Sequence, residues 1–157
     1  MHSVKFVSVL FILALICPAA LAKDSHTYST WDTVELDTIA SAWLIKRSVD
    51  PMAEFKFFPK GELITEGIAF DTPDAEYRRT QNKSTFETIV DTYRIVDLKI
   101  LTLGKIIHNL EINYWQNALL QDSRDIQEDI RALIVASKNN NECLEKGLGY
   151  FDAWYKK

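Results

Sequence analysis

Five segments of the chain repeat apolar residues at intervals of three and four, the spacing of helices with one buried face. Local signals support several of the helix ends. Ser84 and Glu87 have the spacing of a capping box, Asp97 is placed as a helix cap, and Pro51 must end the first helix because the residue before a proline avoids the α region. The predicted helices span residues 37–47, 84–93, 97–115, 123–137 and 143–155.

Alternating apolar and polar residues are confined to the N-terminal part of the chain. This pattern predicts short strands at 31–36, 54–58 and 67–71. The strands precede the main run of helices, which favours an α+β fold over regular β–α alternation. We therefore expect a helix-rich α+β domain over residues 31–157, in which a small N-terminal sheet is packed by about five helices.

The first 22 residues have the pattern of a signal peptide. Lys5 precedes an apolar run at 6–16, and Ala20-Leu21-Ala22 forms a small-residue cleavage site. The run is shorter than the roughly 20 residues of a membrane span. A lipid anchor on Cys17 is the alternative, but the large Ile16 before it disfavours lipidation. We expect cleavage after Ala22, no stable membrane anchor, and export to the periplasm or medium.

Residues 23–30 are polar, and we expect them to form a flexible lead-in on which His26 is solvated. Cys143 would be the one cysteine left after cleavage, so no intramolecular disulfide is expected. A half-buried structural thiol is the ordinary interpretation of Cys143, and a reactive thiol is the alternative.

The charge of the chain limits the classes of partner that it can bind. The chain has 18 basic and 22 acidic residues, a net charge of −4, and no basic stripe, which excludes a typical nucleic-acid-binding protein. An anionic ligand would have to be held by a local cluster of cations. Arg78, Arg79 and Lys83 form such a cluster in the sequence, and a solvated basic loop is the ordinary alternative.

Four charged residues lie at the ends of predicted elements or in the loops beside them, where binding sites commonly form. Asp37 begins the first predicted helix, Asp71 ends the third predicted strand, and Glu76 lies in the loop that follows. Arg47 is in the last turn of the first helix, where the helix dipole favours a cation. Each also has an ordinary role: an N-cap for Asp37, a turn for Asp71, a solvated loop for Glu76 and a dipole partner for Arg47.

His108 and Glu111 are three residues apart on a predicted helix, so their side chains lie close enough to share a divalent metal. The alternative is a histidine on the helix surface that hydrogen-bonds to a carboxylate. The sequence contains no G-x-S-x-G nucleophile motif, no phosphate-binding glycine loop and no H-E-x-x-H zinc motif.

Several motifs resemble the C-terminal domain of the chromate resistance (ChrB) family. The stretch from Asp37 to Arg47, followed by the segment from Asp50 to Phe57, is similar to its most specific signature. Further similar segments follow in the expected order at 69–77, 84–87 and 147–155. Where the family commonly has Gly-His this chain has Arg78-Arg79, and its acidic H-D-x-D-like segment is here His108-Asn109-Leu110-Glu111.

The resemblance implies an exported, stand-alone member that binds a metal or small oxyanion as a sensor or binding module. Its expected binding residues are Asp37, Arg47, Asp71 and Glu76, with His108 and Glu111 as the metal-binding pair.

Two alternatives remain open. The first is a metal-assisted acid–base enzyme, in which Asp71 or Glu76 has a raised pKa near His108. The second is a non-catalytic interaction module that uses an exposed patch formed by Trp115, Trp154 and Tyr155.

Overall fold

The fold is a small parallel sheet lying over a set of helices, as seen in a computed structural model that describes residues 26–113 and 121–157. The predicted helix-rich α+β class is confirmed. The elements in chain order are β1 (Thr27–Trp31), α1 (Leu36–Leu44), a π-helical turn η1 (Ile45–Val49), β2 (Glu54–Phe58), β3 (Ile68–Ala69), α2 (Thr85–Thr92), α3 (Leu98–Glu111), α4 (Gln121–Ala136) and α5 (Asn140–Lys156).

The sheet is built around a strand that lies earlier than predicted. Its order is β2-β1-β3, both pairings are parallel, and the central strand β1 occupies 27–31 rather than 31–36. Residues 27–30 are buried, so this part of the expected flexible lead-in belongs to the fold. Threonine and tyrosine are good strand formers, but this segment lacks the alternation of apolar and polar residues from which strands were predicted. His26 is likewise tied down, because its Nδ1 hydrogen-bonds to the Asp50 carboxylate at 2.9 Å.

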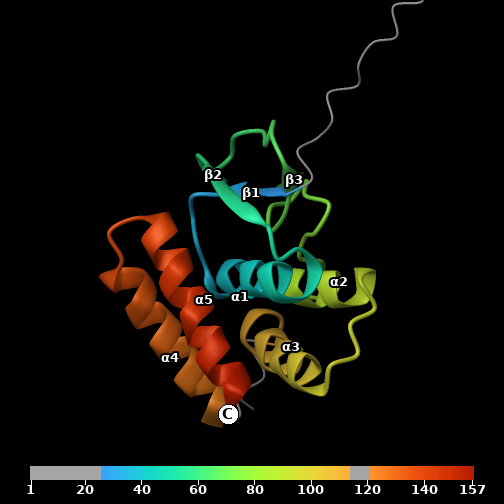
Figure 1. Cartoon of the computed structure of the whole chain (residues 1–157), viewed down its shortest axis with the longest axis vertical. Helices are drawn as coiled ribbons and strands as arrows, with labels where there is room; N and C mark the ends of the chain where they lie inside the picture. The colour runs from blue at the N-terminus through green and yellow to red at the C-terminus, as the bar shows by residue number, and fades with distance from the viewer. Residues whose placement is uncertain (1–25, 114–120) are drawn as a thin grey trace, which may run out of the picture.

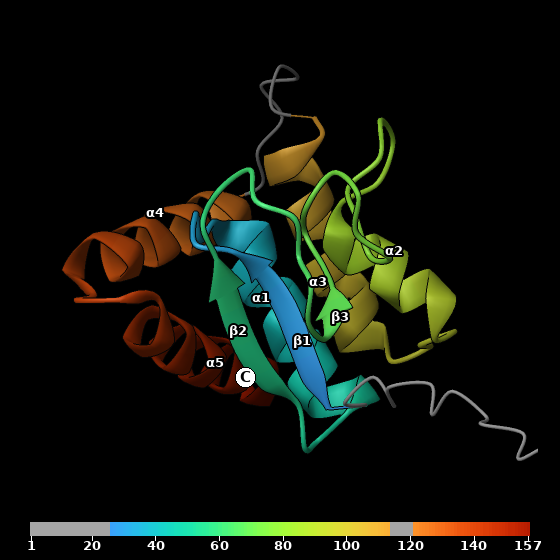
Figure 2. The same ribbon diagram turned by 90° about the horizontal axis from the view of Figure 1, so that it is seen from above.

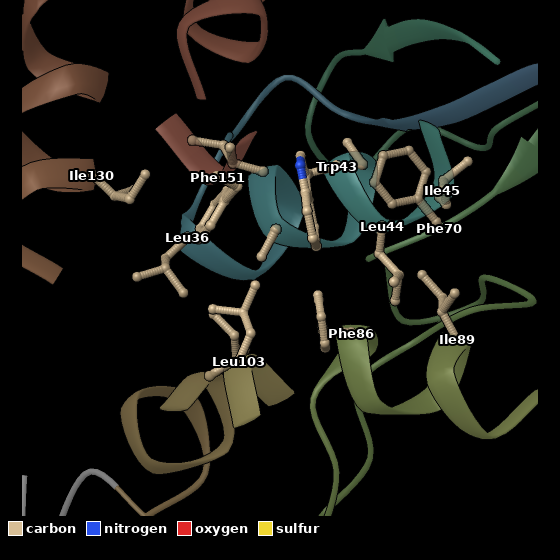
Figure 3. Packing of buried hydrophobic residues seen from close by; sticks show 14 of the residues in the cluster. Leu36, Trp43, Leu44, Ile45, Phe70, Phe86, Ile89, Leu103, Ile130 and Phe151 are labelled. Atoms are coloured by element: carbon tan, nitrogen blue, oxygen red, sulfur yellow. The ribbon is translucent and has the colours of Figure 1, made fainter. Parts of the chain in front are cut away.

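Helix α1 is the centre of the molecule. The strands cross over it, with α4 and α5 on one side and α2 and α3 on the other (Figures 1 and 2). All nine of its residues are buried. Figure 3 shows side chains of the other helices converging on α1, among them Phe86 of α2, Leu103 of α3 and Phe151 of α5. The periodic apolar faces predicted from the sequence therefore meet around one helix.

The predicted helix boundaries are reproduced where local caps define them. The Ser84 hydroxyl accepts the amide of Glu87 at the start of α2, and Asp97 accepts the amides of Lys99 and Ile100 at the start of α3. The predicted end of the third helix at Trp115 lies outside the described residues.

The aromatic patch predicted for an interaction module is described only in part. Trp154 and Tyr155 are partly buried against the core, and Trp115 lies outside the described residues. Within residues 26–113 and 121–157, no helix is long and apolar enough to cross a membrane.

Helices α1 and α5 approach closely at Gly147, which gives a matched pair of test substitutions. A Cβ atom at Gly147 would lie 2.2 Å from Cγ2 of Ile39, whereas one at Gly149 meets nothing within 4 Å. We expect Gly147→Ala to lower the free energy of unfolding by about 1–3 kcal/mol through overpacking. Gly149→Ala should raise it by up to about 1 kcal/mol through helix propensity. Chemical denaturation measures both, and equal effects would contradict this packing.

Candidate functional site

Asp37 is buried inside the first turn of α1 and does not cap that helix as predicted. The cap is Glu35, which forms a capping box with Thr38. The Asp37 carboxylate instead accepts the backbone amides of Thr85 and Phe86, at 2.7 and 3.0 Å, at the start of α2. Asp37 therefore caps a helix that begins 48 residues further along the chain.

Asp71 lies beside Asp37 and shares a partner with it. Its Oδ1 accepts the hydroxyl of Thr85 at 2.7 Å, and its Oδ2 accepts the hydroxyl of Thr38. Thr85 thus bonds both acids, with its amide donating to Asp37 and its hydroxyl donating to Asp71. Asp71 has a left-handed backbone with φ of 53°, a conformation that aspartate and asparagine adopt more readily than most residues. The structure brings these two predicted site residues together.

The two carboxyl groups cannot both ionise easily at this depth. Burial raises the pKa of Asp37, against the effect of the two amides that favour its charged form. Burial and the nearby charge of Asp37 raise the pKa of Asp71 to about 7. The amides facing Asp37 can only donate, whereas the hydroxyls facing Asp71 can also accept a hydrogen bond. We therefore assign the proton that the pair retains near neutral pH to Asp71.

Arg79 and Glu111 complete the charged arrangement around the acid pair. The Arg79 guanidinium forms an ion pair with Glu111 of α3, and its Nη2 lies 3.8 Å from Oδ2 of Asp37. Burial raises the pKa of Glu111, and the charge of Arg79 opposes that rise. Glu111, predicted as a metal ligand, is therefore one of two acids that hold Arg79 in place.

A pocket of about 560 Å³ opens beside this acid pair. Asp71 belongs to its wall, and three cationic side chains, Lys60, Arg78 and Arg79, share the same space. The full lining is Trp31, Thr33, Glu35, Lys60, Asp71, Thr72, Pro73, Arg78, Arg79, Thr80 and Gln81. A larger cavity of about 640 Å³ lies among α3, α4 and α5, and its walls contain none of the predicted site residues. The pocket beside Asp71 is therefore the candidate site, suited to a small anion.

Arg47 and Glu76 lie apart from this pocket. Arg47 donates two hydrogen bonds to the Asp152 carboxylate, at 2.8 and 2.7 Å, and Trp43 Nε1 donates a third at 2.9 Å. Arg47 therefore ties α5 to the end of α1. Glu76 is an exposed loop residue outside the pocket wall. The structure supports a packing role for Arg47 and gives no binding role to Glu76.

The two residues predicted to bind a metal together, His108 and Glu111, contact different partners. His108 Nδ1 hydrogen-bonds to the Glu87 carboxylate at 2.9 Å, while Glu111 pairs with Arg79. This matches the alternative stated for His108, a helix-surface histidine bonded to a carboxylate. In the described parts of the chain, no group of three or more His, Cys, Asp or Glu side chains could hold a metal ion.

Sequence reasoning missed several members of the site. Lys60, Thr38 and Thr85 were not among the predicted site residues. The two threonines act on Asp71 across 33 and 14 residues of chain, which local spacing does not reveal. The basic cluster was a usable signal for Arg78 and Arg79. Lys83, the third member of that cluster, pairs with Asp91 on α2 instead.

Fold and site together define a helix-rich α+β domain with a buried acid pair beside a cationic pocket. The family model described as "ChrB, C-terminal domain" matches residues 28–157, so the chain belongs to this family. Membership supports a role related to chromate resistance. No curated protein and no solved structure matches the chain.

The two acids should respond differently to the same isosteric change. In Asp37→Asn, one of the two helix amides would face an NH₂ group, and losing that bond should lower the free energy of unfolding by about 1–3 kcal/mol. In Asp71→Asn, the threonine hydroxyls can rotate to accept, so the cost should be smaller. Urea denaturation at neutral pH tests this, and similar losses in both variants would contradict the assignment.

The pKa of Asp71 also predicts an unusual pH dependence of stability. Its pKa is about 7 when folded, against an ordinary value of 3.8, so between about pH 4 and pH 7 the folded state binds more protons than the unfolded state. The stabilisation that Asp71 adds to the free energy of unfolding is therefore fully present below about pH 4 and is lost as the pH rises to about 7. Denaturation across this range should show wild type losing stability relative to Asp71→Asn, by on the order of 1 kcal/mol or more. If stability changed with pH in the same way in wild type and in Asp71→Asn, a raised pKa of Asp71 would be excluded.

Proposed function

We propose that the protein binds a small oxyanion in the pocket that contains Lys60, Arg78, Arg79 and Asp71. The observation that carries this proposal is that three cationic residues, against the two acids Glu35 and Asp71, line one pocket in a chain whose net charge is −4. In an acidic protein, an anion has to be held by such a local cluster, because the overall field repels it.

The cations reach the pocket from different segments, which suits a compact ligand with several oxygens. Lys60 follows β2, whereas Arg78 and Arg79 lie in the connection between β3 and α2. Arg78 is steadied by a hydrogen bond from its Nη1 to the carbonyl of Ala75 at 3.0 Å. Guanidinium groups form strong, charge-assisted hydrogen bonds to oxyanions. Chromate is the first ligand to test because of the family, and sulfate has the same tetrahedral shape.

An acid–base enzyme is a second candidate, favoured by one observation. Asp71 lines the pocket with a pKa of about 7, which suits a group that donates a proton near neutral pH. Arg79 in the same wall would stabilise negative charge on a substrate. His108 hydrogen-bonds to Glu87, so this role would fall on Asp71 without the histidine envisaged above. An enzyme would convert its ligand with time, whereas a binding module would release it unchanged.

We also propose that the protein is exported after removal of residues 1–22. The support is the leader-like pattern of Lys5, the apolar run at 6–16 and Ala20-Leu21-Ala22. N-terminal sequencing of the protein from fractionated cells tests this. A mature chain that begins at Lys23 in the periplasmic or medium fraction is the expected result, and an intact Met1 in the cytoplasmic fraction would refute it.

Oxyanion binding should depend on the cations that are not already paired with a buried acid. We expect chromate and sulfate to bind the wild type in titration calorimetry. The double variant Lys60→Gln, Arg78→Gln should bind at least about tenfold more weakly, because charge-assisted hydrogen bonds are lost. Lys105→Gln is the matched control, since it removes a charge from an exposed site on α3 outside this pocket. Absent binding, or equal affinity in all three proteins, would refute the proposal.

A further inference from the structure

We propose that Asp71, which lies beside Asp37, makes the pocket select among oxyanions by the number of protons that they carry. The pocket binds a fully ionised dianion together with one proton from solvent, and Asp71 holds that proton. This inference rests on the oxyanion-binding function proposed above and deepens it. The cationic residues alone would not confer this selectivity, because a pocket of arginines and lysines attracts an anion whether or not the anion itself is protonated.

The geometry places an acid in the wall of the proposed anion pocket. Asp71 lines the pocket alongside Arg78 and Arg79, and Thr85 links it to the fully buried Asp37 behind it. The charge of Arg79 is already shared, since it pairs with Glu111 and approaches Asp37 at 3.8 Å. The charged groups facing the acid pair and the pocket are Glu35 at the N-cap of α1, Glu111 of α3, and the loop residues Lys60, Arg78 and Arg79.

Hydrogen-bonding capacity then decides which anions fit. An ionised carboxylate is an acceptor only, and so is a bare dianion such as sulfate or chromate, so the two repel when they meet in the wall. A protonated Asp71 can donate its O–H to the anion. Binding of a dianion should therefore draw one proton from solvent onto the Asp71 carboxylate, and dissociation should release it. Monohydrogen phosphate carries a proton of its own and can donate it to ionised Asp71.

The ion pair between Arg79 and Glu111 sets the strength of the same site. An anion in the pocket competes with Glu111 for the Arg79 guanidinium, which is 37% exposed in its side chain. Glu111→Gln keeps the shape of the side chain and removes the competing charge. We expect this variant to bind sulfate roughly fivefold more tightly, the scale of one partly exposed ion pair.

Calorimetry with sulfate from about pH 6 to about pH 8 tests the inference, each titration being repeated in two buffers with different heats of ionisation. Above the pKa of Asp71, about 7, wild type should take up close to one proton per sulfate, and affinity should fall by about tenfold per pH unit. Asp71→Asn presents a permanent NH₂ donor, so it should bind sulfate without proton uptake and with little pH dependence. Inorganic phosphate should show weaker pH dependence in the wild type.

The outcomes separate this inference from the function on which it rests. Sulfate bound by wild type without proton uptake would overturn the inference and leave oxyanion binding intact. A pH dependence that persists in Asp71→Asn would overturn it in the same way. No binding of any anion across the range would overturn the proposed function itself. If Asp71→Asn fails to fold, the two-buffer titration of wild type still decides, with Lys105→Gln as the variant expected to keep wild-type proton uptake.

Discussion

The carboxylate of Asp37 is the interaction on which the arrangement of this domain depends. It belongs to α1, the helix buried on all sides, and a buried carboxylate without partners is strongly destabilising. Its oxygens are satisfied by the amides of Thr85 and Phe86 and by the Ser41 hydroxyl. One polar group thus fixes the start of α2 against the first turn of α1. Apolar packing alone, being non-directional, would leave that position less well defined.

The candidate site follows from this anchor. Once Thr85 is held by Asp37, its hydroxyl is positioned to bind Asp71, and a second carboxyl comes to lie beside the first. Burial and the neighbouring charge of Asp37 raise the pKa of Asp71. The ion pairs of Arg79 with Glu111 and with Asp37 balance part of this negative charge. Clustering buried acids in this way works against stability. A local conflict of this kind is expected where structure serves function, and here it lies at the wall of a cationic pocket.

The residues of the family-like motif from Asp37 to Arg47 have different roles. Ile39 packs into the close contact with α5 at Gly147. Trp43 and Arg47 both donate to Asp152, so the polar end of the motif fastens α5 to the core. Asp37 and Thr38 connect the motif to the candidate site, Asp37 through the start of α2 and Thr38 through its hydrogen bond to Asp71. Most of this signature therefore describes packing around one helix, and the residues that distinguish the pocket, Arg78 and Arg79, lie outside it.

The sequence by itself determined the features whose causes are local. The helices, the capping box of α2, the Asp97 cap of α3 and strand β2 were predictable because periodic apolar faces and these cap hydrogen bonds involve residues a few positions apart. Tertiary structure decided the rest. It made a central strand of residues 27–31, which have no alternating apolar pattern, and it placed Asp37 at the start of a helix 48 residues away. It also paired Glu111 with Arg79, 32 residues distant, and not with His108. Spacing shows which residues share a face of one element, but the partner across an interface is set by how whole elements bury their surfaces together.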